Sequence, residues 1–319
     1  MSPIWKIIQR IPSLEERITE DLYSVSPKKI KKELKRAKRE KELNKYRDIL
    51  AIYSKVISGE VMEWVKSRSL TILNGRDTAG KWWVIKRMSY DLDASLYDVI
   101  ALWKPTQSDV EMMQENPEHH FNRYHSKVTS DKNIWFGDRS FYNRALVEPV
   151  MWFCSKEAYE WFINWAVQEF EKKHIIWEWF DYTKIYLSIT PETQIKRLER
   201  RESNPRKQWK LSPIDREAPN KVDEYSLAKM IMLEQTDLPD APWTIIDSNN
   251  KDKAAIETIK AIVRQNTSVR EVVESIAKQV WINASLDADR SMVRTASEEL
   301  EKMKQIWQVP TWVKFEFSD

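Results

Sequence analysis

The residues best suited to chemistry lie in one short loop, from Gly75 to Lys81, which reads GRDTAGK. Its pattern, G-x-x-x-x-G-K, is the start of a phosphate-binding loop of the Walker A type, in which backbone N–H groups surround phosphate oxygens and the lysine reaches the outer phosphates. Only four glycines occur in the chain, and Gly75 and Gly80 both fall here, which indicates a backbone requirement. The motif's usual Ser or Thr is replaced by Trp82. We therefore expect a phosphate site with an unusual residue at its edge.

Asp77, inside this loop, makes the expectation more specific. A carboxylate beside a bound phosphate is repelled unless a cation lies between them. Asp77 therefore predicts a bound Mg²⁺, or a role in orienting an attacking phosphate oxygen. The simpler alternative is that Asp77 only caps the helix that follows.

A second group of polar residues, from Asp138 to Arg144, reads DRSFYNR and follows an apolar run at 134–136. Phosphate-loop enzymes place a magnesium-orienting Asp at the carboxyl end of a strand, and Asp138 fits that position. Arg139 and Arg144 could each hold phosphate oxygens through paired hydrogen bonds. The alternative is a surface turn with a local Asp–Arg pair.

A basic stretch from Arg197 to Lys210 is interrupted by Pro205 and lies between two predicted strands. Such a segment is a candidate lid, which would close over bound phosphates and exclude the water that hydrolyses a transferring group. The alternative is a solvated amphipathic helix. We interpret a second basic run, from Lys28 to Arg47, as a solvated helix face.

The elements that must position these residues alternate between strand and helix. Five apolar runs predict strands, at 70–73, 98–102, 134–136, 185–189 and 243–247. This alternation predicts an α/β fold of three layers, with a five-stranded parallel sheet and right-handed crossovers. The Gly75 loop lies between the first strand and a helix expected at 82–88, whose N-terminus adds partial positive charge to the phosphate site. We expect a helical extension at 1–66, a core at 67–266 with a lid at about 197–222, and a helical appendage at 267–319.

Composition restricts the class of protein. The 319 residues are 42% hydrophobic and 32% charged, enough for a buried core, and the net charge of +3 is too small to indicate a nucleic-acid partner. The single cysteine, Cys154, excludes an intramolecular disulfide. Without a signal peptide or an apolar run of membrane-spanning length, we expect a cytoplasmic protein with no membrane partner. The four histidines, including adjacent His119 and His120, do not have metal-ligand spacing.

In this order, the motifs resemble the family-2 polyphosphate kinases, which belong to the phosphate-loop kinases. The resemblance covers about residues 44–264 and is highly specific as a set. Its main matching stretches are Asn74–Lys81, Ile85–Arg87, Asp138–Ala145, Val147–Met151, Trp209–Pro213 and Asp223–Tyr225.

The resemblance implies a Mg²⁺-dependent, reversible transfer of a phosphoryl group between inorganic polyphosphate and a nucleotide. It also implies a five-stranded parallel core with a helical lid, and assembly into dimers or tetramers. Asp77 and Asp138 would handle Mg²⁺ and the acceptor phosphate. Lys81, Arg139 and Arg144 would bind the phosphates of polyphosphate or of the nucleotide.

Further binding residues follow from the same resemblance. The implied lid contacts are Arg197, Arg201, Lys207 and Lys210. The other implied substrate-binding residues are Gly75, Arg76, Ala79, Gly80, Lys86, Arg87 and Asn143. The stretch Val147–Met151 is similar to that of members which phosphorylate nucleoside diphosphates, converting ADP or GDP to ATP or GTP.

One departure from the family pattern bears on activity. Trp82 and Trp83 stand where Gly-Gly or Ser-Gly is usual after the loop lysine. Two indoles could crowd the phosphate site, or point away into a core, because successive side chains on a helix diverge by about 100°. We expect a polyphosphate:nucleoside-diphosphate phosphotransferase. Two alternatives stay open: an ATP-using nucleotide kinase of the same fold, and a catalytically impaired polyphosphate-binding scaffold.

Overall fold

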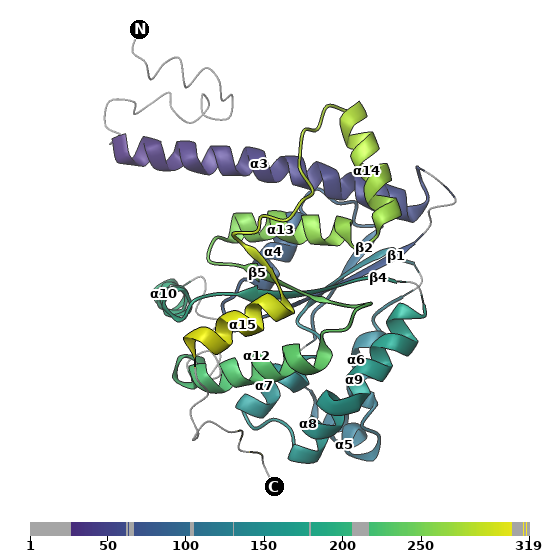
Figure 1. Ribbon diagram of the computed structural model, residues 1–319, viewed down its shortest axis with the longest axis vertical. Helices are drawn as coiled ribbons and strands as arrows, with labels where there is room; N and C mark the ends of the chain where they lie inside the picture. The colour runs from purple at the N-terminus through teal and green to yellow at the C-terminus, as the bar shows by residue number, and fades with distance from the viewer. Residues whose placement is uncertain are drawn as a thin grey trace. The chain divides into compact units, whose positions relative to one another are not determined.

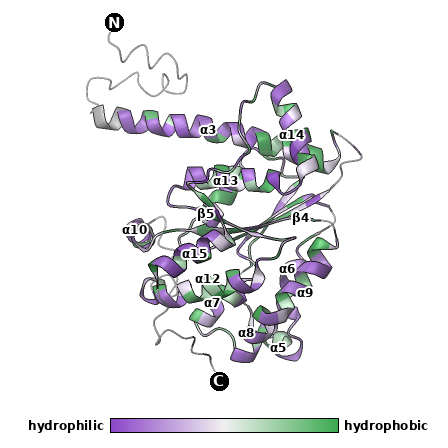
Figure 2. Ribbon diagram, viewed as in Figure 1, coloured by the Kyte–Doolittle hydropathy of each residue, from purple (hydrophilic) through white to green (hydrophobic). Residues whose placement is uncertain are grey.

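A computed structural model describes residues 27–61, 63, 67–102, 105–129, 131–178, 180–205, 217–307, 315 and 317. The chain divides into two compact units, Met1–Glu42 and Leu43–Asp319. In the first unit the described residues form the N-terminal part of helix α3 (Pro27–Ser58), which is predominantly hydrophilic (Figure 2). The basic run 28–47 is therefore helical, as expected. The rest of the fold belongs to the second unit.

A six-stranded sheet forms the centre of the second unit (Figure 1). Its strands, in spatial order, are β2 (Tyr97–Ile100), β3 (Ile134–Asp138), β1 (Arg68–Asn74), β4 (Phe180–Ser188), β5 (Trp243–Asp247) and β6 (Val293–Thr295). The first five are parallel. They correspond to the five predicted strands, so the α/β class and the parallel core are confirmed.

The predicted count of five strands is wrong. Strand β6 pairs antiparallel to β5 at the edge of the sheet, with Val293 opposite Ile246. It lies within 267–319, where we expected only helices. Three residues are too few to show the alternation of apolar and polar side chains that identifies a strand, and β6 is defined by its backbone pairing with β5.

Helices cover both faces of the sheet and make three layers (Figure 1). One face carries residues 43–58 of α3, α4 (Lys81–Met88), α13 (Lys251–Arg264) and α14 (Thr267–Gln279). The other carries α6 (His119–His125), α7 (Asn143–Val150), α8 (Lys156–Trp161), α9 (Val167–Glu171), α12 (Val222–Thr236) and α15 (Ala296–Ile306). The remaining helical segments are α5 (Gln107–Glu115), η2 (Phe162–Ala166), η3 (Lys172–Ile176), α10 (Pro191–Glu202) and η5 (Ala218–Lys221).

The core follows the alternation of side chains along the strands. In β3, Trp135 packs into the cluster on the α7 and α12 side, whereas Ile134 and Phe136 pack into the cluster on the α4 and α13 side. All three are fully buried. A strand buried on both faces is apolar throughout, which is why these runs were recognisable in the sequence.

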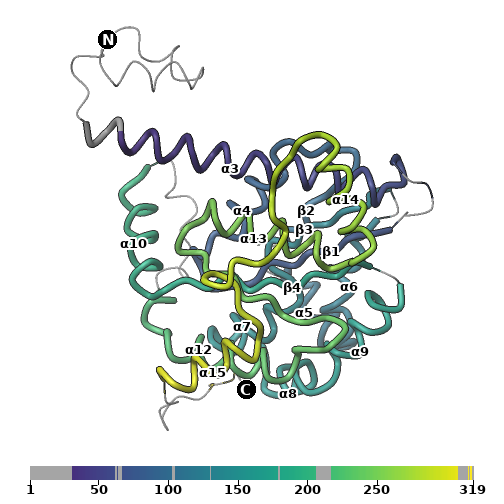
Figure 3. The backbone as a smooth tube through the Cα atoms, turned by 45° about the horizontal axis from the view of Figure 1, so that its top comes forward, coloured from purple at the N-terminus to yellow at the C-terminus, as the bar shows by residue number. Residues whose placement is uncertain are grey.

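Helix α10 follows the carboxyl end of β4 and lies beyond that end of the sheet (Figure 3). Thr190 caps it by accepting a hydrogen bond from the N–H of Thr193, and Pro191 occupies the first helical position. No helix among the described residues is long and apolar enough to cross a membrane.

Candidate functional site

The predicted phosphate loop lies between the end of β1 at Asn74 and the start of α4 at Lys81. Gly75 has φ +139°, and a Cβ there would lie 2.4 Å from the carbonyl oxygen of Leu187 in β4. Gly80 has φ +102°. Both backbones lie in the region that favours glycine, and Gly75 also allows the loop to approach β4 closely. A residue with a side chain would therefore be strained at either position.

Arg197 of α10 holds the loop from outside. Its Nη1 donates hydrogen bonds to the carbonyl oxygens of Thr78 (2.8 Å) and Ala79 (3.0 Å), and its Nη2 donates to that of Ser248 (2.6 Å). The Ser248 hydroxyl donates to the Ala79 carbonyl at 2.7 Å. Sequence reasoning placed Arg197 on the substrate as a lid contact. In the structure its guanidinium instead ties the loop to the segment after β5.

Lys81 is buried, with 6% of its surface exposed. Its Nζ donates hydrogen bonds to the carbonyl oxygens of Gly75 at 2.8 Å and Arg76 at 3.2 Å. The ammonium therefore lies inside the curve of the loop, where a phosphate-binding lysine is expected.

The electrostatic surroundings of Lys81 lower its pKa to about 8. Burial is the largest cause, and the positive charges of Arg139 and Arg201 act in the same direction. The carboxylates of Asp77 and Asp138 oppose the shift. Lys81 is thus a buried cation close to both predicted magnesium-binding aspartates and two arginines.

Asp77 and Arg139 form an ion pair, with Arg139 Nη2 at 2.5 Å from Asp77 Oδ1. Burial raises the pKa of Asp77, but the charges of Arg139, Lys81 and Arg201 outweigh it and hold the pKa below its ordinary value. Asp77 in turn raises the pKa of Arg139. Both groups are therefore charged at neutral pH. Asp77 is not the N-cap of α4, a position that Gly80 occupies.

Asp138 ends β3 in register with Leu73 of β1. The backbone N–H of Arg139, the next residue, donates to the Leu73 carbonyl at 3.1 Å. Arg139 has φ +77°, an uncommon conformation for a residue with a side chain. The four residues predicted as catalytic (Asp77, Lys81, Asp138 and Arg139) therefore lie together at the carboxyl ends of adjacent parallel strands.

A buried hydrogen bond fixes the two catalytic segments to each other. The side-chain amide of Asn74 donates to the hydroxyl oxygen of Ser140 at 3.0 Å, and that oxygen also accepts from the N–H of Tyr142 at 3.2 Å. Asn74 and Ser140 are almost fully buried. This contact sets the spacing between the loop after β1 and the turn after β3.

A cavity of about 10 Å³ adjoins the ion pair and is lined partly by Asn143, Tyr186 and Tyr225. The Tyr225 hydroxyl is buried and has no hydrogen-bond partner among the described residues. Burial raises the pKa of the Tyr225 hydroxyl, and the negative charge of Asp77 raises it further. The space is about that of one water molecule, so the Asp77–Arg139 pair leaves little room at this point.

Two arginines predicted to bind substrate have protein partners. Arg76 donates from Nη2 to the carbonyl of Val222 (3.0 Å) and the hydroxyl of Ser226 (2.7 Å), so it joins the loop to α12. Arg144 is buried in an ion pair with Glu148. The Arg76 contacts therefore link two elements, whereas the Arg144–Glu148 pair lies within α7. Asn143 lines the cavity and donates from Nδ2 to the Tyr124 hydroxyl at 3.3 Å.

The other predicted residues are less central. Lys86 is exposed near the end of α4, and Arg87 forms an ion pair of 3.5 Å with Asp252. Arg201 contributes charge near Lys81 and Asp77. Lys207 and Lys210 lie outside the described residues, as do 206–216 of the expected lid.

Neither tryptophan after the loop lysine lines the cavity beside Asp77. Trp82 is 47% exposed. Trp83 packs at the edge of the α4 and α13 core, with the Arg87 guanidinium 5.3 Å and the Lys251 ammonium 5.7 Å from its ring centre. The structure therefore favours the interpretation in which both indoles point away from the phosphate site.

Sequence reasoning missed three residues of this site: Tyr225, Ser248 and Asn74. Tyr225 lies in a stretch that carries the family resemblance, and Ser248 directly follows a predicted strand, as Asp138 does. Position after a strand was therefore a usable signal for Ser248. The direction of the Tyr225 hydroxyl depends on how α12 packs, which no local pattern reports.

The donor set suits Mg²⁺. This ion usually takes one or two carboxylates and completes its shell with water and substrate phosphate oxygens. Asp77 and Asp138 supply two carboxylates at one edge of the sheet, beside a lysine and an arginine that can bind the phosphates.

Comparisons with known proteins find relatives of this chain. A family model described as Polyphosphate kinase 2 (PPK2) matches residues 33–272. The chain is 38% identical to NDP-polyphosphate phosphotransferase 2 of Ruegeria pomeroyi over 193 residues, which cover 60% of this chain but only 54% of that protein. It is 35% identical to ADP-polyphosphate phosphotransferase of Pseudomonas aeruginosa over 223 residues, covering 69% of this chain and 70% of that protein.

The fold has a counterpart among solved structures. The crystal structure of Polyphosphate Kinase 2 from Arthrobacter aurescens TC1 superposes with a TM-score of 0.60 and 24% identity. The match covers 82% of this chain and 84% of that chain.

Proposed function

This chain belongs to the polyphosphate kinase 2 family, and we propose on this premise that it transfers a phosphoryl group reversibly between inorganic polyphosphate and a nucleoside diphosphate. The observation that carries the proposal is the convergence of Asp77, Lys81, Asp138 and Arg139 at the carboxyl ends of β1 and β3. Two carboxylates and two cations at one point suit a reaction in which phosphates and a metal ion meet.

Binding would rest on Lys81 and the backbone of the loop. The Lys81 ammonium is directed at loop carbonyl oxygens, and an incoming phosphate would offer it stronger, charged acceptors. Arg139 would exchange its partner, Asp77, for phosphate oxygens. Arg197 and Ser248 would keep the loop in shape during this exchange, because their bonds go to backbone carbonyls and do not use the loop N–H groups.

Asp77 and Asp138 would hold Mg²⁺, which supplies neutralisation of phosphate charge when bound. The charge on Asp77 is already stabilised by its surroundings, so no proton has to leave before a cation binds. We also assign Tyr225 a binding role: its buried hydroxyl would donate a hydrogen bond to a phosphate oxygen in the adjoining cavity.

The protein itself needs to supply little covalent chemistry. In-line phosphoryl transfer depends on the alignment of donor and acceptor and on neutralisation of the charge that spreads over the transferring group. Lys81 and Arg139 are positioned for the second task, and the Asn74–Ser140 contact maintains the alignment of the segments that carry them.

We infer a lid at about 197–222, supported by the charge of Arg201 near Lys81 and by the link from Arg197 to the loop. The family resemblance supports a dimer or tetramer. Sedimentation of the purified chain tests this, and a monomer at micromolar concentration would contradict it.

Product analysis separates the proposed function from its alternatives. The protein is incubated with Mg²⁺ and either ADP plus long-chain polyphosphate, or AMP plus ATP. The proposal predicts that ATP forms in the first mixture only when polyphosphate is present. An ATP-using nucleotide kinase would convert the second mixture to ADP and, by the reverse reaction, would form ATP and AMP from ADP whether or not polyphosphate is present. A scaffold would bind polyphosphate tightly, with an affinity that falls as salt rises, but would turn over neither mixture.

A further inference from the structure

Two histidines and a glutamate that the sequence did not connect lie together, away from the phosphate loop. His125, His174 and Glu178 each offer one ligand atom, and these three atoms lie within 4.8 Å of one another. The four histidines do not have metal-ligand spacing along the chain, but two of them lie close together in the fold. The only local signal was the separation of His174 and Glu178 by four residues, which brings side chains to one face of a helix.

The fold brings the two imidazoles together from separate segments. His125 is the last residue of α6, and His174 lies in η3. Their ring centres are 5.3 Å apart. The Phe170 ring contacts both, with centroids 6.0 Å from His125 and 5.1 Å from His174. One side of the cluster is thus an apolar wall, which reduces competition from water for the ligand atoms.

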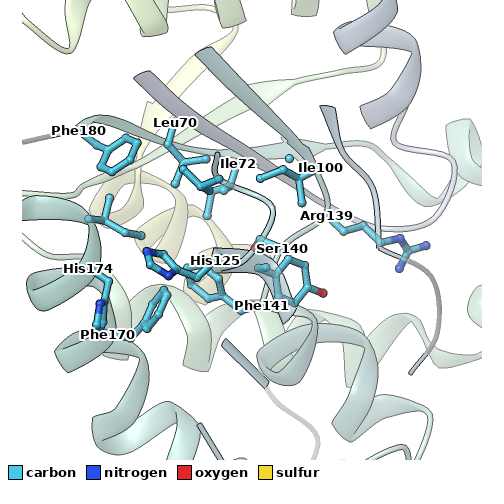
Figure 4. A pocket seen from close by; sticks show the side chains of 14 residues that line it. Leu70, Ile72, Ile100, His125, Arg139, Ser140, Phe141, Phe170, His174 and Phe180 are labelled. Carbon is cyan, nitrogen blue, oxygen red and sulfur yellow. The ribbon is translucent and has the colours of Figure 1, made fainter. Parts of the chain in front are cut away.

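The cluster borders an apolar cavity of about 30 Å³, which also reaches Arg139. Figure 4 shows His125, His174 and Phe170 at one end of this cavity and Arg139 at the other. A ligand at the histidine end would therefore be separate from the phosphate site, although residues of both sites line the same cavity.

Glu178 is charge-paired in the structure, but only weakly. Its Oε2 lies 3.4 Å from Nη2 of Arg68, and the two side chains are 39% and 40% exposed. Exposed ion pairs of this kind contribute little free energy. Arg68 also donates to the backbone carbonyl of Glu178 at 3.0 Å, so it keeps a partner if the carboxylate turns to a cation.

We propose that His125, His174 and Glu178 bind a divalent transition-metal ion of the zinc type. Two imidazoles and one carboxylate are a set that zinc uses, with a fourth position open to water, whereas Mg²⁺ prefers oxygen ligands alone. Bond lengths of about 2.0–2.2 Å place tetrahedral ligands roughly 3.3 Å apart. Small side-chain rotations therefore suffice to close the site. The bound ion would join α6 to η3, and this inference is independent of the proposed function.

The test uses the full chain without a histidine tag, stripped of metal with a chelator and titrated with Zn²⁺ in a calorimeter. We expect one equivalent to bind at this site, and His174→Gln and Glu178→Gln each to weaken it at least about tenfold. His119→Gln is the matched control, because His119 is a half-buried histidine on the same helix as His125 but outside the cluster. It should bind Zn²⁺ as the wild type does.

Two further measurements make the result specific. Co²⁺ should give visible absorption typical of low coordination number, which excess Mg²⁺ leaves unchanged and His174→Gln removes. Asp77→Asn should retain the signal, because the phosphate site is separate. The proposal is overturned if the wild type binds no Zn²⁺, if His174→Gln binds it normally while showing the wild-type melting temperature without metal, or if Asp77→Asn loses it.

Discussion

Arg139 Nη2 donates a hydrogen bond to Asp77 Oδ1 across the gap between the turn after β3 and the loop after β1. Each group stabilises the charge of the other. The pair occupies the point where the proposed metal ion and phosphate chain would meet, and we therefore infer that substrate binding replaces the Asp77–Arg139 contact. Asp77 then becomes free for a cation, and Arg139 for phosphate oxygens.

Lys81 should make substrate capture sensitive to alkaline pH. Its pKa is lowered from 10.5 to about 8, and anion binding needs the charged form. We predict that kcat/KM falls about tenfold per pH unit above about pH 8, because this ratio reports groups of the free enzyme. Lys81→Arg keeps its charge throughout this range, so its rates, though lower, should not show the fall. A wild-type profile that is flat from about pH 7 to about pH 9.5 would refute the assignment.

The same shift affects stability in a defined direction. Between about pH 8 and pH 10.5 the unfolded chain holds a proton on Lys81 that the folded chain has lost. The free energy of unfolding therefore gains a contribution that rises with pH through this window. Chemical denaturation of wild type and Lys81→Met at both ends of the window measures it as a difference between the two proteins.

Arg197 is predicted to position the loop without touching substrate. Arg197→Lys keeps the charge but cannot donate to three carbonyl groups in the same plane. We expect kcat to fall about 10–100-fold, since small displacements of catalytic groups cost rates of that order. Arg290→Lys, at an exposed arginine outside the inferred lid, is the control and should not change kcat. Equal rates for the two variants would show that the carbonyl contacts are not needed.

Removal of the Tyr225 hydroxyl tests its binding role. A hydrogen bond to a charged group contributes about 1.5–3 kcal/mol, so Tyr225→Phe should lower kcat/KM about 10–100-fold. The melting temperature should not drop, because the hydroxyl is buried without a partner in the described structure. Tyr90→Phe, at an exposed tyrosine, is the control. Unchanged kinetics in Tyr225→Phe would remove this residue from the site.

Substitutions of Trp82 and of Trp83 should have different effects, although the two residues are neighbours in the sequence. Trp82→Ala changes an exposed side chain outside the cavity, so we expect the wild-type rate. Trp83→Ala removes packing against the α4 and α13 core and two cation–π contacts, and should lower the melting temperature. A marked gain of activity in Trp82→Ala would instead indicate that the indole crowds the phosphate site.

The sequence was most informative where a backbone constraint leaves a residue signature. Gly75 is required by the approach to Leu187, and the strands 134–136 and 185–189 are apolar because both faces are covered. The apolar runs predicted the parallel core, and the loop motif and the group after 134–136 predicted that Asp77, Lys81, Asp138 and Arg139 lie together; their roles stay predictions. Strand β6 could not be predicted, because its three residues form a strand only through their backbone pairing with β5.

The roles of the arginines were harder to predict than their presence. Arg76 and Arg197 look alike in a list of basic residues, but the packing of α12 and α10 gives them protein partners. The approach of His125 to His174 likewise depends on the packing of α6 against η3. Contacts between segments distant in sequence decide these cases, and a single sequence carries no record of them.

The most direct test of the central claim is the initial rate of ATP formation from ADP, Mg²⁺ and long-chain polyphosphate, measured for the wild type, Lys81→Ala and Asp77→Asn. The account predicts clear turnover by the wild type and a loss of about 100-fold or more in each variant, since each removes a charge at the point of transfer. The reverse reaction, polyphosphate formation from ATP, should show the same losses. Wild-type protein that forms no more product than Lys81→Ala, in either direction, would contradict the account.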